Sequence, residues 1–192
     1  MNLPNKLTIL RIIMIPLFAI CYYLTVIPYN FIVSAVIFAL ASLTDFLDGF
    51  IARKYNLVTD FGKFLDPIAD KVLVSTALIV LIVPPTGFSA FGSYFTVASA
   101  VCVAIIIARE LIVSGFRLVA AGKNLVIAAD KSGKLKTFFT DVTILFVLVV
   151  MTFTNGALQI ISFVLLVVTT LLTVYSGLEC IIKNKDVLKD NQ

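Results

Sequence analysis

The sequence predicts an all-α integral membrane protein with about six transmembrane helices, first of all because of its composition. Hydrophobic residues make up 60% of the 192 residues, charged residues make up only 14%, and the mean hydropathy is +1.09. Soluble domains are typically about half apolar and about a quarter charged. The lipid bilayer is therefore the expected solvent of this chain.

Six apolar stretches have the length that a helix needs to cross the hydrocarbon core, which is about 20 residues. They are residues 8–28, 31–53, 66–84, 94–116, 135–153 and 158–182. Only short connectors separate them, so residues 1–192 are expected to form a single domain. No cleavable signal peptide is expected, because the first stretch contains Arg11 and no small-residue cleavage site follows it.

The connectors alternate in charge along the chain. Those near residues 28–30, 84–93 and 154–156 contain no charged residue, whereas every basic residue lies toward the opposite ends of the same stretches. The positive-inside rule therefore predicts that both termini are cytoplasmic. The acidic residues also lie in the cytoplasmic half, which indicates a polar site that opens to this side. A net charge of +4 on so apolar a chain favours an anionic lipid surface over nucleic acid as a partner.

Four aspartates fall within 26 positions around the second predicted connector: Asp45, Asp48, Asp66 and Asp70. The first two are three residues apart and the last two are four apart, so each pair shares one helix face. Buried carboxylates without counter-ions cost several kcal/mol each, which makes divalent cations the expected counter-charge. The chain has no histidine, and oxygen ligands favour Mg²⁺ or Mn²⁺. Because Mg²⁺ commonly joins carboxylates to substrate phosphates, the expected substrate carries a diphosphate.

Glycines lie beside both aspartate pairs, and the absence of a Cβ at Gly49 and Gly62 indicates close approach of a ligand to the backbone. The complete motif is D-x-x-D-G-x-x-A-R, eight residues, then G-x-x-x-D-x-x-x-D. It resembles the signature of the CDP-alcohol phosphotransferase family at every fixed position. The resemblance implies that the four aspartates bind two divalent cations, Mg²⁺ or Mn²⁺, which hold the diphosphate of CDP-diacylglycerol. It also implies that Asp70 is the general base, that the protein is a homodimer, and that four motif residues contact the nucleotide end of this substrate: Gly49, Ala52, Arg53 and Gly62.

The N-terminal segment, residues 2–11, is similar to the P-N-x-L-T-x-x-R entry segment of the same family. In that resemblance Asn5 and Thr8 help to hold the nucleotide. The alternative is a polar helix start whose Arg11 side chain extends toward the membrane interface. The sequence alone does not decide between these two interpretations.

A second group of basic residues, Arg109, Arg117 and Lys134, lies at the cytoplasmic ends of the fourth and fifth predicted helices. Such a cluster suits an acceptor that already carries phosphate, because a dianion accepts charge-assisted hydrogen bonds from Arg and Lys. The surrounding residues resemble the bacterial branch of the family whose acceptor is sn-glycerol 3-phosphate, and this resemblance implies a bacterial plasma membrane as the location. The predicted reaction is therefore transfer of the phosphatidyl group from CDP-diacylglycerol to glycerol 3-phosphate in phospholipid synthesis.

Three alternatives remain for these residues. The basic cluster could serve only to orient the helices in the membrane. The same chemistry could use serine, inositol phosphate or phosphatidylglycerol as the acceptor. A small cation carrier would also place carboxylates within the membrane, but it would need polar groups that continue to the outer face, where the predicted helices are almost wholly apolar.

Overall fold

The computed structural model describes residues 2–55, 59–83, 87–88, 92–123, 125, 127, 131–153 and 155–188. These residues form six α-helices, followed by a short 3-10 helix, η2, at Lys185–Leu188. The α-helices are α1 (Leu3–Tyr23), α2 (Asn30–Lys54), α3 (Asp60–Ile82), α4 (Ser93–Gly122), α5 (Lys131–Val150) and α6 (Gly156–Lys183). One helix covers most of each predicted stretch, so the all-α class is confirmed.

Four of the described helices are long and apolar enough to cross a membrane: α1, α2 over Asn30–Ala52, α4 and α6. Helices α3 and α5 have 23 and 20 residues, which is a comparable length, but charged residues interrupt their apolar sequences. In α3 these include Asp66, Asp70 and Lys71. The charges that interrupt α3 belong to the polar region described below.

Local sequence explains several helix ends. Thr59 accepts a hydrogen bond from the backbone N–H of Gly62 at 3.0 Å, and Asn155 accepts one from Ala157 at 2.9 Å, so these residues cap α3 and α6. Helix α1 begins at Leu3, before the apolar stretch predicted from residue 8, because Pro4 is tolerated in a first helical turn. Its polar first turns therefore belong to the helix and reach the site.

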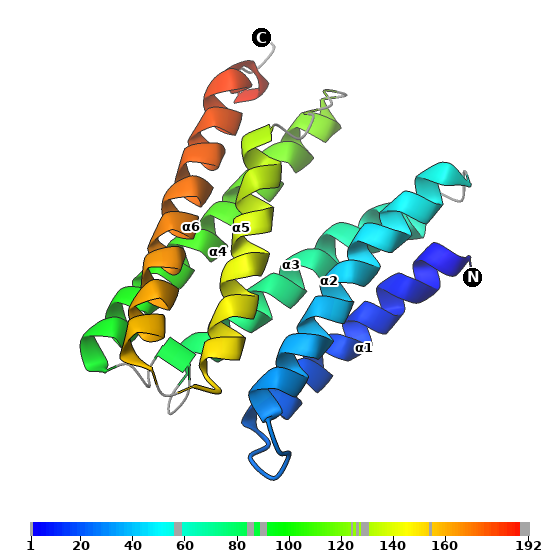
Figure 1. Ribbon diagram of the computed structural model, residues 1–192. Coiled ribbons are helices and arrows are strands. Elements are labelled where there is room, and N and C mark those ends of the chain that lie inside the picture. Colours follow the sequence, from blue (N-terminus) through cyan, green and yellow to red (C-terminus); the bar gives the residue numbers. More distant parts are fainter. Residues whose placement is uncertain are drawn as a thin grey trace.

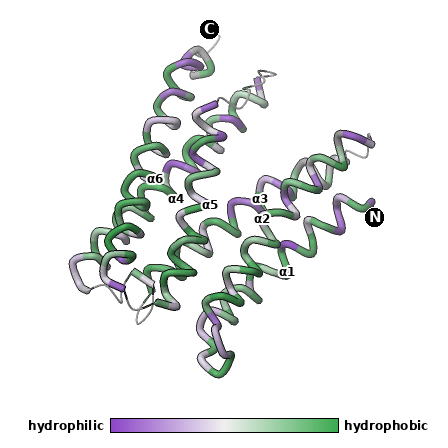
Figure 2. Tube along the Cα trace, viewed as in Figure 1, coloured by the Kyte–Doolittle hydropathy of each residue, from purple (hydrophilic) through white to green (hydrophobic). Residues whose placement is uncertain are grey.

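The helices form two adjoining groups, α1–α3 and α4–α6 (Figure 1). Helix α1 packs on α2 and α3, α6 packs on α4 and α5, and α2 contacts α5 between the groups. Both termini lie at the same end of the molecule (Figure 1), and hydrophilic residues gather toward that end, whereas the opposite half is mostly hydrophobic (Figure 2). The largest buried hydrophobic side chains form a core through both groups: Phe18, Tyr22, Phe38, Leu73, Leu78, Leu81, Phe88, Ile106, Ile144, Leu148 and Leu166.

Many large apolar side chains point outward from this bundle, including Ile13, Leu118 and Leu171 at 59%, 75% and 65% exposure. A soluble monomer rarely exposes apolar patches of this extent, and a lipid environment accounts for them. Inside the bundle, the hydroxyl groups of Thr143 and Thr169 share a 2.8 Å hydrogen bond that joins α5 to α6. Polar bonds of this kind are a common means of holding membrane helices together.

Candidate active site

Arg11 of α1 joins the two motif aspartates of α2. Its Nη1 atom lies 2.7 Å from Oδ1 of Asp45, and its Nη2 atom donates a 2.5 Å hydrogen bond to Oδ2 of Asp48. The side chain of Arg11 is fully buried and that of Asp48 is only 2% exposed, whereas Asp45 is 43% exposed. Arg11 is thus an internal counter-charge for the motif, and the interpretation in which it extends to the membrane interface is wrong.

Thr8, one helical turn before Arg11, connects the same cluster to α3. Its hydroxyl donates to Oδ1 of Asp66 at 2.7 Å and lies 3.5 Å from Oδ2 of Asp48. Both Thr8 and Arg11 are fully buried. Three of the four motif aspartates therefore converge on two side chains of α1, and the entry segment and the aspartate motif form one polar cluster.

Asn5 and Gly62 meet at the outer edge of this cluster. The hydroxyl of Thr59 donates to Oδ1 of Asn5 at 3.0 Å. A Cβ atom added at Gly62 would lie 3.0 Å from that same Asn5 oxygen and 3.2 Å from the Thr59 hydroxyl. A side chain at residue 62 would therefore crowd the contact between α3 and α1, which gives Gly62 a packing role in addition to the close ligand approach that the sequence predicts.

The aspartates of this cluster offer carboxylate oxygens, and oxygen atoms are the ligands that a hard divalent cation such as Mg²⁺ prefers. Within the described part of the chain, however, no three acidic side chains come close enough to hold a metal ion by themselves. Mg²⁺ usually needs only one or two carboxylates together with substrate phosphate oxygens. The aspartates therefore fit a cation that arrives with, or is completed by, a diphosphate.

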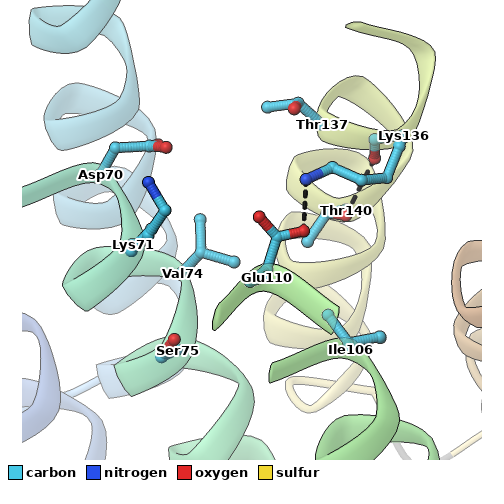
Figure 3. A pocket seen from close by; sticks show the side chains of 9 residues that line it. All are labelled: Asp70, Lys71, Val74, Ser75, Ile106, Glu110, Lys136, Thr137 and Thr140. Carbon is cyan, nitrogen blue, oxygen red and sulfur yellow. Dashed lines mark hydrogen bonds and ion pairs between the residues drawn. The ribbon is translucent and has the colours of Figure 1, made fainter. Parts of the chain in front are cut away.

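Asp70, the fourth motif aspartate, faces the second group of helices. Across a narrow pocket it faces Glu110 of α4 and Lys136 of α5, with Thr137 and Thr140 on the same wall (Figure 3). Lys136 donates a hydrogen bond to Glu110. Asp70 thus stands at the boundary between the acidic cluster and a region where basic residues predominate.

A cavity of about 500 Å³ adjoins this pocket, and its described lining contains five basic and two acidic side chains. They are Lys71, Arg109, Arg117, Lys134, Lys136, Asp70 and Glu110. All three basic residues singled out from the sequence therefore share one cavity with Asp70. Cavities of about 300–1,000 Å³ are typical of small-molecule sites.

Arg109 is held by bonds on two sides. Its Nη1 atom donates to Glu110 at 3.0 Å, and its Nη2 atom donates to the hydroxyl of Ser176 on α6 at 2.8 Å. Glu110 also accepts from Lys136, so one carboxylate fixes two cations at the cavity wall. Arg117 and Lys134 are exposed, which leaves them accessible to a solute.

The other nucleotide-site residues lie on α2 beside the acidic cluster. Gly49 follows Asp48 directly and Ala52 lies one turn later, both partly buried. The side chain of Arg53 lies outside the described part of the structure. Two further residues of this region, Lys136 and Ser176, were not predicted from the sequence. Lys136 lies only two residues from Lys134, whereas Ser176 belongs to no recognisable motif.

Comparison with known proteins adds independent information. A family model described as CDP-alcohol phosphatidyltransferase matches residues 1–175. The chain is 41% identical over 203 aligned residues to the CDP-diacylglycerol–glycerol-3-phosphate 3-phosphatidyltransferase of Bacillus subtilis, covering 98% of this chain and 97% of the relative. The protein of the same name from Rickettsia typhi is 39% identical, covering 92% of this chain and 93% of the relative. The one from Salmonella typhimurium is 41% identical, covering 71% of this chain and 70% of the relative.

Proposed function

This chain belongs to the CDP-alcohol phosphatidyltransferase family, and we propose that it transfers the phosphatidyl group of CDP-diacylglycerol to sn-glycerol 3-phosphate. The products are phosphatidylglycerophosphate and CMP, in the route to phosphatidylglycerol. The acceptor follows the name of the relatives that align over nearly the whole chain. The observation that carries the proposal in the structure is the single cavity that Asp70 shares with the basic residues of α4 and α5.

The excess of basic over acidic side chains in this cavity suits a phosphate-bearing acceptor. Arg109, Arg117 and Lys134 can each donate charge-assisted hydrogen bonds to a phosphate dianion. Serine or another acceptor without phosphate would give the exposed cations Arg117 and Lys134 no phosphate to bind. Inositol phosphate and phosphatidylglycerol also carry phosphate, so the acceptor has to be identified by direct comparison.

The acidic cluster is the proposed site of the CDP-diacylglycerol diphosphate. Asp45, Asp48, Asp66 and Asp70 would hold two divalent cations, Mg²⁺ or Mn²⁺. When bound, these ions would neutralise the diphosphate and stabilise CMP as the leaving group. Six residues at the edges of the cluster would contact the nucleotide end of the substrate: Asn5, Thr8, Gly49, Ala52, Arg53 and Gly62.

In the proposed reaction Asp70 is the general base. The acceptor hydroxyl loses its proton to the Asp70 carboxylate while its oxygen forms a bond to the phosphorus that carries diacylglycerol. The bond from that phosphorus to the CMP oxygen breaks, and CMP leaves with the electron pair. The location of Asp70 between the acidic cluster and the basic cavity supports this role, because the base has to reach both substrates.

The membrane arrangement is part of the same proposal. All six helices would cross the bilayer, including α3 and α5, whose outward apolar side chains such as Ile79 and Phe138 (47% and 62% exposed) would face lipid, and both termini would lie in the cytoplasm. The polar end in Figure 2 would then face the cytoplasm, where glycerol 3-phosphate and CMP are soluble. The relatives named above come from bacteria, which supports a bacterial plasma membrane. A homodimer, implied by the family resemblance, completes the proposal.

The test is CMP release by the purified protein in detergent, with CDP-diacylglycerol and either Mg²⁺ or Mn²⁺. Glycerol 3-phosphate is compared with serine, inositol phosphate and phosphatidylglycerol, and the wild type is compared with Asp70→Asn. Release with glycerol 3-phosphate alone, abolished by a chelator and by the substitution, is the expected result. Release with a different acceptor would retain the chemistry but reject the assignment of the cavity, and no release with any acceptor would contradict the proposed reaction.

A further inference from the structure

Helix α6 contacts Arg109 through two consecutive residues that neither the motif nor the reaction chemistry includes. Ser176 is 3% exposed, and its hydroxyl accepts the 2.8 Å hydrogen bond from Nη2 of Arg109. Gly177 is also buried. A Cβ atom added at Gly177 would lie 2.8 Å from Nε, 2.9 Å from Cγ and 3.4 Å from Cδ of Arg109.

These distances explain why residue 177 is a glycine. Gly177 lies inside α6 and needs no left-handed backbone conformation, so alanine would favour the helix by about 1 kcal/mol. The three nearest atoms to the added Cβ all belong to the Arg109 side chain, and none belongs to the backbone of a neighbouring helix. They lie in the middle of that side chain, so a methyl group at residue 177 would displace the whole arginine rather than only its tip.

We infer that Ser176 and Gly177 are positioning residues that hold the Arg109 guanidinium at the cavity wall and thereby set the affinity for the phosphate-bearing acceptor. This inference rests on the proposed function. Gly177 provides the space through which the arginine stem passes, and Ser176 fixes the orientation of its terminal group. Neither residue is expected to touch the acceptor.

The bonding of Arg109 shows what this positioning achieves. Within the described part of the chain, Glu110 accepts one N–H from Nη1 of Arg109, and Ser176 accepts one N–H from Nη2. Each terminal nitrogen of a guanidinium carries two N–H groups, so one remains on each for an anion in the cavity. Glu110 also accepts a hydrogen bond from Lys136. The hydrogen bond to Ser176 therefore orients Arg109 relative to Lys136 as well as to the cavity. A rotated Arg109 would lose this relation to Lys136 as well as its own access to the phosphate.

The experiment compares Gly177→Ala and Ser176→Ala with Gly156→Ala in steady-state kinetics of CMP release. Gly156 is a matched control, because it lies on the same helix and an added Cβ there meets nothing within 4 Å. Gly177→Ala is expected to raise the KM for glycerol 3-phosphate about tenfold or more, the loss typical of one charge-assisted hydrogen bond, without changing the KM for CDP-diacylglycerol. Ser176→Ala is expected to act in the same direction to a smaller extent, and Gly156→Ala is expected to match the wild type.

A double-mutant cycle separates positioning from simple helix packing. Arg109→Ala removes the three atoms nearest to the new methyl group, so Gly177→Ala should have little further effect in that background. Full additivity of the two substitutions, or an equal rise in both KM values, would overturn the inference. Stabilisation of the protein by glycerol 3-phosphate, measured as a shift in Tm, provides the same comparison for variants with too little turnover.

The outcomes also distinguish this inference from the proposed function. A wild type that releases no CMP with glycerol 3-phosphate contradicts the proposed function itself. An active wild type with an unchanged KM for glycerol 3-phosphate in Gly177→Ala and Ser176→Ala contradicts only the positioning role. If Gly177→Ala does not fold, Ser176→Ala still decides the question, because it removes the hydrogen bond without adding atoms.

Discussion

Replacement of Arg11 by methionine is expected to destabilise the protein strongly and to make its stability depend on divalent cations. Arg11 is fully buried, and its partner Asp48 is 2% exposed, so methionine would leave a buried carboxylate without its counter-charge. Loss of one member of a buried ion pair costs about 3–5 kcal/mol. The bond to Asp45 adds at most about 1 kcal/mol, because that carboxylate is 43% exposed and solvent screens the pair. For a chain of this size the total corresponds to a fall in Tm of roughly 10 °C.

The assay is thermal unfolding of the purified protein in detergent, with chelator and with Mg²⁺ or Mn²⁺. Divalent cations should raise the Tm of Arg11→Met more than that of the wild type, since they would supply the charge that the variant lacks. Arg11→Lys should be intermediate, because an ammonium group lacks the planar fork that reaches two carboxylates. Lys6→Met, at an exposed position on the same helix, is the control for loss of charge. A Tm of Arg11→Met within about 2 °C of the wild type would refute the reasoning, because it corresponds to less than about 1 kcal/mol.

Three further predictions follow from individual contacts. Asp70→Asn should reduce kcat for CMP release at least about 100-fold, as expected for loss of a general base, and a variant that retains a tenth or so of wild-type turnover would exclude this role. Arg117→Ala should raise the KM for glycerol 3-phosphate about tenfold but not that for CDP-diacylglycerol, and an equal rise in both would argue against an acceptor contact. Thr143→Val should lower the stability of the protein by about 0.5–1.5 kcal/mol without changing either KM, because it removes the 2.8 Å bond to Thr169, and neither residue lines the pocket or the cavity. An unchanged Tm would mean that this bond contributes nothing.

The fold class and the number of helices could be read from the sequence, because apolar stretches of membrane length dominate it. The helix ends were less accurate, since hydropathy does not report where a helix begins. Helix α1 starts five residues before the predicted stretch, at Leu3 rather than residue 8, because Pro4 and the polar residues after it are compatible with a first turn. Helix α4 similarly continues to Gly122, beyond the predicted end at residue 116.

The acidic half of the candidate site could be anticipated because its residues follow one compact motif. Asp45 and Asp48 are separated by a single helical turn, so their shared face follows from helix geometry alone. The role of Arg11 could not be settled in this way. An arginine near the start of a membrane helix can extend to the interface or turn inward, and only the packing of α1 against α2 decides between the two.

The arrangement of the basic residues in the cavity was harder to predict from the sequence, because it depends on contacts between helices that are distant in the sequence. Lys134 and Lys136 are two residues apart, so they project in different directions from α5, and only the position of Glu110 on α4 determines which of them is held at the narrow pocket. Ser176 is farther still from any motif, 67 residues after Arg109. The charge pattern along a single helix therefore identifies which residues are available to an anion, whereas their orientation toward it is set by the neighbouring helices. For this reason a substitution on α6, which carries none of the motif residues, is expected to change the recognition of the acceptor.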